Sequence, residues 1–349
     1  GCSLTLGLKA GKIVWVSSRP ESPNEGNLCV KGRYGWPYIY SEQRLTRPLI
    51  KRDGKLQEVG WDEALNYVAD GFSRLKKQFG SRSLATLGSE RLTNEEAYVL
   101  NRFVRTVLET PNLDHAGGYA YRPLVDGLGL SLGFPATTNS LRELRKADVI
   151  VLVGADLHET HPIAKNEVII ATGRRKAKVI IVGPIQTKFT ERPGTFLPTP
   201  TGCEYVLANS MLNVIINENL YDKAALNLRA EGLEGLIQSL HSYSPENVSN
   251  NLGLSPDTIR EAARVYGKAR NAAIVMVAGM NRSANEVAAA QAAANLALVT
   301  GHIGKEANGV YILGEKANAQ GAIDMGLFPE GLPGFASLTV QEDRERFEA

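Results

Sequence analysis

Residues 149–162 read Val-Ile-Val-Leu-Val-Gly-Ala-Asp-Leu-His-Glu-Thr-His-Pro, a continuous apolar run followed by a turn and a proline. An apolar run without alternation predicts a strand that is buried on both faces of its sheet. The periodic segment 163–172 that follows predicts a helix, and Val179–Val182 predicts the next strand. This order of strand, helix and strand predicts a parallel sheet covered by helices on both faces, the doubly wound α/β class.

The same pattern continues toward the carboxyl end of the chain. Segments 205–217 and 286–299 have helical periodicity, and Ala273–Val277 between them predicts another buried strand. Ser255-Pro256 predicts the start of a further helix, because serine caps free N–H groups and proline fits the first turn. The chain therefore contains at least two sets of alternating strands and helices.

The amino-terminal part follows a different pattern. Residues 4–16 alternate as in an antiparallel hairpin, and Leu84–Leu87 predicts a strand. Between them, apolar residues recur at three- and four-residue steps over 61–79, which predicts an amphipathic helix. Residues 93–96, Thr-Asn-Glu-Glu, form a capping box that predicts a helix running to about Glu109.

The composition excludes several classes of protein. The chain has 349 residues, 39 Lys and Arg against 37 Asp and Glu, 43% hydrophobic residues and three cysteines. It is long enough for two domains, and it is neither a disordered tail nor a disulfide scaffold. The net charge of +2 disfavours nucleic acid, and the apolar runs are too short to span a membrane. We therefore expect small-molecule or protein partners and a cytoplasmic location.

The turns after the strands carry no nucleotide fingerprint. The turn at Gly154 lacks the glycine spacing of a dinucleotide motif, and Gly301–Lys305 lacks the spacing of a P-loop. The histidines have no metal-ligand spacing, and Cys203 is interpreted as a structural cysteine. Cys2 and Cys29 stand 27 residues apart, and this spacing alone leaves open whether they are apolar side chains or metal ligands.

Seven ordered segments carry a further signal: Gly1-Cys2, Leu28–Arg33, Arg44–Ile50, Val59–Leu65, Thr93–Glu96, Ala294–Gly301 and Ala319–Gly326. Each segment is short, but their order along nearly the whole chain is specific. In this order the chain resembles the molybdopterin oxidoreductases of the formate dehydrogenase type. It also resembles the related large iron-sulfur subunit of the respiratory NADH:quinone oxidoreductase, complex I.

The resemblance implies a particular domain organisation. A small β-rich iron-sulfur lobe would comprise residues 1–48, followed by two doubly wound α/β domains, one inserted into the other, as in the formate dehydrogenase and DMSO reductase fold (domains I to III). The outer domain would comprise residues 49–123 and 294–349, and the inserted domain residues 124–293. No initiator Met precedes Gly1, and the family's carboxy-terminal domain is missing. We therefore expect a piece of a longer protein that is inactive by itself.

The resemblance also implies an iron-sulfur site. Cys2 matches the third ligand and Cys29 the fourth ligand of the family's four-cysteine 4Fe-4S motif. Because two thiolates do not hold a cubane, we expect the cluster in the intact protein and not in these residues alone. Lys31 resembles the residue between the cluster and the pterin. Its alternative interpretation is a solvated surface lysine.

Three chemical positions of the family are changed. Ala120 aligns with the cysteine or selenocysteine that ligates molybdenum, Tyr121 with the histidine that follows it, and Gln291 with the substrate-side arginine. A methyl group cannot coordinate a metal, and a glutamine cannot replace a bidentate arginine toward formate. These replacements predict that no residue of this chain acts as the family's catalytic groups do.

Whether a molybdopterin guanine dinucleotide still binds is left open by the sequence. Asp156, Glu159 and His161 lie in the turn that resembles the family's dinucleotide contact, and Glu204 stands where an acidic residue would hold a guanine edge. Residues 182–186, however, lack the Asp and Arg expected at the corresponding strand end. The alternative is that His161 begins a helix and Glu204 helps to cap one.

The changed positions favour one hypothesis over two alternatives. The leading hypothesis is an electron-transport scaffold domain of a multisubunit NADH dehydrogenase of the complex I type, without a functional molybdenum ligand. The first alternative is a formate dehydrogenase alpha subunit or related molybdopterin-dependent oxidoreductase. The second is a protein-interaction module that binds no cofactor. In the first two cases the partners would be other subunits of a redox complex.

Overall fold

The computed structural model describes residues 2–191, 194–221, 223, 226, 230–279 and 283–348. The chain forms two compact units, which we call the outer unit (Gly1–Gly118 with Lys316–Ala349) and the inserted unit (Tyr119–Glu315). The three-part division expected from the resemblance, with boundaries at residues 48, 123 and 293, stays a prediction.

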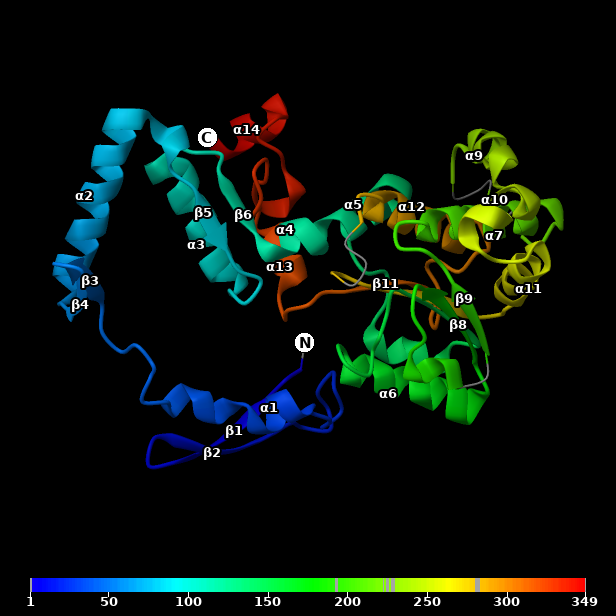
Figure 1. Ribbon diagram of the computed structural model, residues 1–349, viewed down its shortest axis with the longest axis horizontal. Helices are drawn as coiled ribbons and strands as arrows, with labels where there is room; N and C mark the ends of the chain where they lie inside the picture. Colours follow the sequence, from blue (N-terminus) through cyan, green and yellow to red (C-terminus); the bar gives the residue numbers. More distant parts are fainter. Residues whose placement is uncertain are drawn as a thin grey trace. The chain divides into compact units, whose positions relative to one another are not determined.

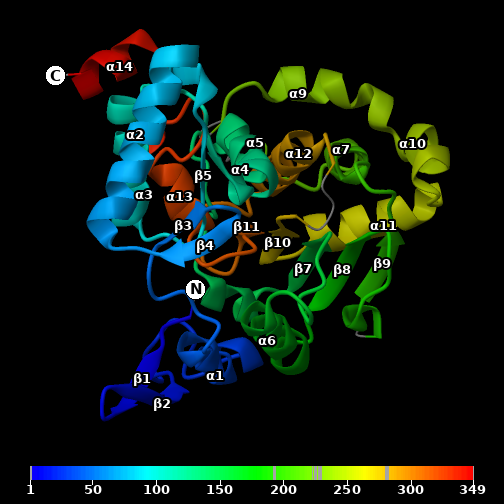
Figure 2. The ribbon, with the colours of Figure 1, turned by 60° about the vertical axis from the view of Figure 1, so that its left-hand side comes forward.

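The inserted unit is built around a five-stranded parallel sheet, visible in Figures 1 and 2. Its order in space is β11-β10-β7-β8-β9, so the chain starts at β7 and adds strands first on one side and then on the other. This arrangement confirms the predicted doubly wound α/β class. The strands are β7 (Val149–Val153), β8 (Lys178–Gly183), β9 (Gly194–Pro198), β10 (Ala272–Val277) and β11 (Gly309–Leu313).

Helices connect the strands of this sheet. Ser255 accepts a hydrogen bond from the Thr258 N–H at the start of α11, which confirms the cap predicted there. The helical elements are α5 (Arg122–Leu132), η4 (Leu141–Lys146), α6 (Pro162–Ile170), η5 (Ala171–Arg175), η6 (Lys188–Glu191), α7 (Glu204–Asn217), α9 (Leu233–Ser239), η7 (Leu240–Tyr243), α10 (Pro245–Leu252), α11 (Pro256–Gly267) and α12 (Glu286–Val299).

Alternate side chains of β7 face opposite sides of the sheet. Ile150 and Leu152 are fully buried in the cluster that includes α6, whereas Val151 and Val153 face α7 and α12. Figure 2 shows α6 on one side of the sheet and α7 and α12 on the other. Because successive strand residues point to opposite faces, a strand covered on both faces is apolar at every position. This explains the continuous run from which the fold was predicted.

The outer unit contains three two-stranded sheets and shorter helices. Its core is a buried cluster that includes Ala97, Val104, Leu113 and Leu327. Its elements are β1 (Thr5–Lys9), β2 (Lys12–Ser17), α1 (Val30–Tyr34), η1 (Trp36–Tyr40), β3 (Leu49–Arg52), β4 (Lys55–Glu58), α2 (Trp61–Phe79), η2 (Ser81–Ser83), β5 (Thr86–Gly88), α3 (Asn94–Phe103), η3 (Val104–Leu108), β6 (Leu113–His115), α13 (Ala319–Asp324), η8 (Pro333–Phe335) and α14 (Gln341–Glu348). A short helix, α4 (Ala116–Ala120), spans the boundary between the units.

Most of the predicted amino-terminal elements are confirmed. The hairpin pairs β1 with β2, α2 has the predicted bounds, and the Thr93 and Glu96 side chains complete the capping box of α3. The strand predicted over Leu84–Leu87 is shifted to β5, which begins at Thr86. The helix predicted to reach Glu109 is an α-helix only to Phe103 and then widens into the π-helix η3.

The helices α5 and α12 pack against each other at a glycine. A Cβ atom at Gly127 would lie 2.3 Å from the Val287 carbonyl oxygen and 3.0 Å from the Gln291 backbone nitrogen. Gly127→Ala is therefore expected to lower the free energy of unfolding by about 1–3 kcal/mol, because the helices must separate. The measurement is urea denaturation followed by circular dichroism.

Gly235→Ala in α9 is the matched control, because nothing lies within 4 Å of its Cβ position. This substitution is expected to be neutral or to stabilise the protein by up to about 1 kcal/mol, since alanine is the better helix former. Equal effects of the two substitutions would contradict the close packing of α5 on α12.

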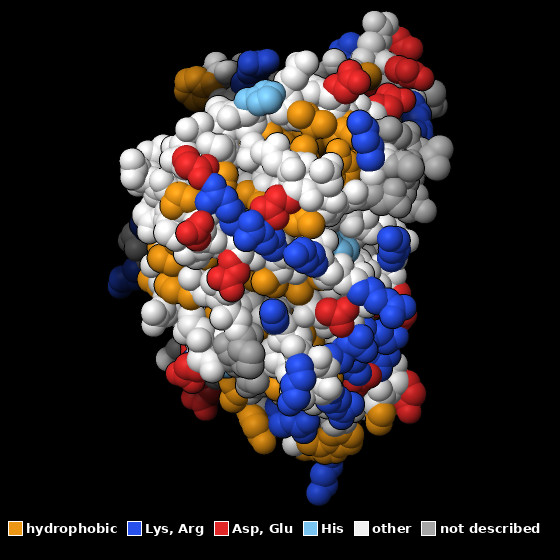
Figure 3. Space-filling view, turned by 90° about the vertical axis from the view of Figure 1, so that its right-hand side faces the viewer, with side chains coloured by type: hydrophobic (Ala, Val, Ile, Leu, Met, Phe, Trp, Pro, Cys, Tyr) orange, Lys and Arg blue, Asp and Glu red, His pale blue; other side chains and the backbone are white. Residues whose placement is uncertain are grey.

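The surface carries charges of both signs. On the face drawn in Figure 3, Asp and Glu side chains lie among Lys and Arg, which gather more densely in the lower half. Among the described helices, none combines the length and apolar character that a membrane span needs.

Candidate functional site

The strand order predicts where a ligand site would lie in the inserted unit. The chain leaves β7 toward β8 on one side and returns to β10 on the other, so β7 and β10 border the topological switch point. In open α/β sheets, ligands bind beyond the carboxyl ends of the strands at this point. The residues that follow Val153 and Val277 therefore form the candidate site.

The loop after β7 contains three of the predicted site residues. Asp156 is half-buried, and its Oδ1 accepts the His158 N–H at 3.1 Å, while its carbonyl accepts from Thr160. Glu159 is exposed at the tip of the same turn. The Asp156 side chain therefore shapes the loop, and Glu159 extends into solvent.

His161 joins this loop to the end of β11. Its Nε2 lies 2.9 Å from the Gly314 carbonyl oxygen, and because a carbonyl only accepts, Nε2 carries the proton. Burial lowers the pKa of His161, and the Gly314 hydrogen bond opposes this shift. His161 is also the N-cap residue of α6, which agrees with the structural interpretation of His161-Pro162. The imidazole thus holds two loops of the carboxyl edge together.

Glu204 lies at the switch point itself. It is the first residue of α7 and only 5% exposed, and it lines a small cavity with Val153 and Met276 of the two switch-point strands. Its Oε2 accepts the Gly202 N–H at 2.8 Å. Burial raises the pKa of Glu204, and the Gly202 hydrogen bond only partly offsets this shift. Glu204 is therefore a buried carboxyl group at the edge where a ligand is expected.

The raised pKa of Glu204 predicts a pH dependence of stability. The folded protein holds the Glu204 proton more tightly than the unfolded chain does. This contribution to stability is fully present below the ordinary pKa of 4.5 and is lost as the pH rises through the higher folded value. We expect the free energy of unfolding to fall less steeply between pH 4 and pH 7 in Glu204→Gln than in the unchanged protein. The measurement is chemical denaturation at several pH values across this range. The same change in the free energy of unfolding with pH in both proteins would contradict the expectation.

Two further carboxylates lie at this edge and are missing from the sequence prediction. Glu286, at the first turn of α12, is 6% exposed and lines the same cavity as Glu204. The Glu315 carboxylate lies 2.4 Å from the position that a Cβ of Gly279 would take. Glu286 is the first residue of α12, and Glu315 follows the end of β11 after Gly314. A helix start and a position after a strand were therefore the available signals.

The three positions that the resemblance identifies as changed, Ala120, Tyr121 and Gln291, all lie in the inserted unit. Ala120 and Tyr121 are buried, at 8% and 4% exposure, where α4 leads into α5. Gln291 is half-buried on α12, beside Gly127 of α5. Ala120 presents only a methyl group, so the residues at this position do not fit a protein ligand to a metal.

The predicted iron-sulfur residues lie in the amino-terminal lobe. Cys29 is half-buried at the N-cap of α1, Cys2 is exposed, and Lys31 is exposed on α1. Cys2 as a residue is exposed, but partial desolvation of its thiol raises the pKa, and the neighbouring Cys29 adds to the shift. Within the described ranges, no group of three or more His, Cys, Asp or Glu side chains is placed to hold a metal ion. The two thiols fit half of a cubane's ligand set.

A second titratable cluster lies in the outer unit, at the carboxyl ends of β5 and β6. Glu90 and His115 are buried, and both side chains lie within 3 Å of a Cβ position at Gly117, Glu90 Oε1 at 2.3 Å and His115 Nε2 at 2.8 Å. His115 Nδ1 lies 2.6 Å from the Leu327 carbonyl oxygen and therefore carries a proton. Only glycine fits at position 117 against these side chains.

Comparisons with known proteins agree with this geometry. The Molybdopterin oxidoreductase family model matches residues 44–333, and the Molybdopterin oxidoreductase Fe4S4 domain model matches residues 1–41. The chain is 38% identical over 354 residues to formate dehydrogenase H of Escherichia coli, covering 99% of this chain and 49% of that protein. It is 37% identical over 339 residues to a formate dehydrogenase subunit alpha of Methanocaldococcus jannaschii, covering 97% of this chain and 50% of that protein.

The fold is similar to that of acetylene hydratase from Pelobacter acetylenicus. The TM-score is 0.76 at 24% identity, over 88% of this chain and 42% of that one. The chain spans about half the length of the curated relatives described above. Because these relatives are formate dehydrogenases, they support the first alternative of the sequence analysis better than its leading hypothesis. The resemblance to the complex I subunit is not confirmed.

Proposed function

The chain belongs to the molybdopterin oxidoreductase family, and from that premise we propose that it holds a molybdopterin guanine dinucleotide at the carboxyl edge of the sheet in the inserted unit. The observation that carries this proposal is the buried Glu204 carboxyl group at the switch point between β7 and β10. A carboxylate accepts two parallel N–H bonds, which suits the edge of a guanine base. When bound, this cofactor would supply the redox chemistry, and the residues of this edge would hold its nucleotide end.

The surrounding residues support the role of Glu204. Asp156 and Glu286 add acceptors at the same edge, and the imidazole of His161 holds the β7 loop to the β11 loop through Gly314. A ligand that presents several N–H donors would find acceptors already in place, because the loops are fixed by hydrogen bonds within the protein. Glu159 would add only a solvent-screened charge at the exposed tip of the turn.

The intact protein would be the alpha subunit of a formate-dehydrogenase-like redox complex in the cytoplasm, with other subunits as partners. Support comes from the two relatives at 37% and 38% identity, both of which are formate dehydrogenases by name. Cys2 and Cys29 would provide two thiolates of a 4Fe-4S cluster, and Lys31 on α1 would stand beside it. A cubane takes further ligands beyond these two.

Formate oxidation itself is proposed to be lost. Ala120 cannot ligate molybdenum, and Gln291 cannot form the two parallel charged bonds with which an arginine holds a carboxylate. Tyr121, buried beside Ala120, places a phenol where the resemblance leads us to expect a histidine. The chemistry that remains is cofactor holding and electron transfer, without the family's substrate-side groups.

Oxidative extraction of fluorescent pterin from the intact protein, purified from its native host, tests the proposal. About one guanine dinucleotide pterin equivalent or more per protein is expected. Absence of pterin from protein that retains its iron-sulfur cluster would overturn the proposal and favour the cofactor-free interaction module.

A further inference from the structure

A large cavity of about 630 Å³ lies in the inserted unit, away from the candidate site. It is lined by the last residues of α5 and α12, by the turn from Thr300 to Lys305, and by Glu231 with its neighbour Ala230. The helix α12 starts beside the carboxyl end of β10 and runs back across the sheet, so its end reaches the opposite edge. This volume is within the range of small-molecule sites.

Two helices end at this cavity in the same direction. Gly127 of α5 meets α12 at Val287 and Gln291, and one turn later Ser131 donates to Asn295. The two helices therefore run parallel, and both of their carboxyl ends border the cavity. Helix carboxyl ends carry partial negative charge, so two adjacent ends favour a cation.

The hydroxyl groups that line the cavity are left as acceptors. Ser131 Oγ donates its proton to Asn295 Oδ1 at 2.6 Å. Thr300 Oγ1 lies 2.8 Å from both the Leu296 carbonyl oxygen and His302 Nδ1. The Thr300 hydroxyl proton is therefore also used in a hydrogen bond within the protein. Both oxygens keep lone pairs for a donor in the cavity. The exposed carboxylate of Glu231 adds a full negative charge at the rim.

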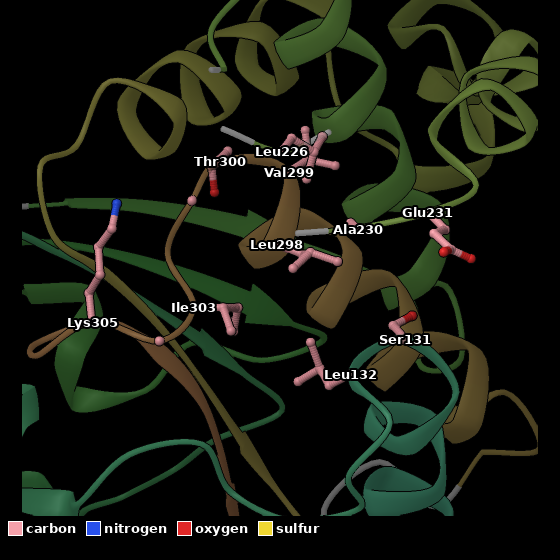
Figure 4. A pocket seen from close by; sticks show the side chains of 12 residues that line it. Ser131, Leu132, Leu226, Ala230, Glu231, Leu298, Val299, Thr300, Ile303 and Lys305 are labelled. Carbon is pink, nitrogen blue, oxygen red and sulfur yellow. The ribbon is translucent and has the colours of Figure 1, made fainter. Parts of the chain in front are cut away.

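Apolar side chains form the rest of the wall. Figure 4 shows Leu132, Leu298 and Ile303 converging at the centre, with Glu231 and Ser131 on one side and Lys305 on the other. The Lys305 ammonium lies 3.6 Å from the Cβ position of Gly301, at the end of α12. The protein thus already places a cation of its own beside one helix end.

We propose that this cavity binds an amphipathic primary amine, with its ammonium group between Glu231, Ser131 and the helix ends and its apolar body against Leu132, Leu298 and Ile303. Except for Lys305, the polar side chains of the lining offer hydrogen-bond acceptors, which disfavour an anionic ligand. An ammonium group offers three donors to these acceptors. This site is independent of the pterin site, and its ligand is recognised by charge and apolar volume.

Isothermal titration calorimetry of the intact protein with hexylammonium, 1-hexanol and hexanoate tests the proposal. Hexylammonium is expected to bind more tightly than either of the other two probes. Glu231→Gln is expected to weaken hexylammonium about threefold to fivefold, the effect of one exposed ion pair, and to leave hexanol unchanged. Lys305→Met removes the competing cation and is expected to strengthen hexylammonium.

Two variants control for indirect effects. Glu234→Gln, an exposed neighbour on α9 outside the cavity, is expected to change nothing. Ile303→Trp fills the cavity and is expected to abolish binding of all three probes, with circular dichroism as the check on folding. Tighter binding of hexanoate than of hexylammonium, weaker hexylammonium binding in Lys305→Met, or no binding of any probe would overturn the proposal.

Discussion

Arg105→Ala is expected to lower the free energy of unfolding by about 2–4 kcal/mol, because it removes a half-buried guanidinium that joins distant parts of the outer unit. Its Nη atoms donate to the carbonyl oxygens of Thr110 at 3.0 Å, Phe328 at 2.8 Å and Pro329 at 3.0 Å. Burial lowers the pKa of Arg105, and Glu330 opposes this shift. Truncation leaves carbonyl groups of two chain segments without their charged donor.

Chemical denaturation and hydrogen exchange over residues 94–110 and 316–338 measure this effect. Arg102→Ala is the matched control, since Arg102 is exposed about one turn earlier, near the end of α3. Arg105→Lys is expected to recover only part of the loss, because an ammonium cannot present the planar fork of donors. A difference below about 1 kcal/mol between the two alanine variants would contradict the role of Arg105.

Glu204→Gln is expected to reduce pterin retention by about 10- to 100-fold, on the proposed assignment of this residue. The substitution replaces two charge-assisted hydrogen bonds to a guanine edge with neutral ones, a loss of about 1.5–3 kcal/mol. The fold should persist, because glutamine keeps an oxygen that accepts the Gly202 N–H. Pterin content per protein after gel filtration is the measurement.

Glu159→Gln is the control for that measurement, since Glu159 is exposed at the tip of the β7 turn. Its pterin content is expected to stay within about twofold of the unchanged protein, the effect of a solvent-screened charge. Equal pterin loss in both variants would show that pterin retention depends on the total negative charge of this edge. That result would contradict a specific hydrogen bond to Glu204.

Much of the secondary structure of the inserted unit can be predicted from the sequence, for a physical reason. The run Val149–Val153 is apolar at every position because both faces of its strand are covered, and that pattern needs no knowledge of partners. The sequence pattern does not predict the strand β9, Gly194–Pro198, because its apolar stretch is very short and lies between a glycine and a proline. Its place in the sheet is set by pairing with β8, which is a tertiary effect.

The sequence predicts a smaller part of the candidate site. Glu204 was identified through the resemblance, but Glu286 and Glu315 were not, because they come together only through the strand order. His161 was predicted as a ligand contact or a helix start, and its hydrogen bond to Gly314 depends on β7 and β11 ending at the same edge. No local pattern contains that information.

We propose that this family member holds a pterin without a protein ligand to molybdenum at Ala120. One preparation of the intact protein, assayed for pterin content and for formate-dependent reduction of a viologen dye, tests it most directly. We expect bound pterin together with no formate-dependent reduction above the rate of a formate-free control. Formate-dependent reduction that follows bound molybdenum or tungsten would contradict it.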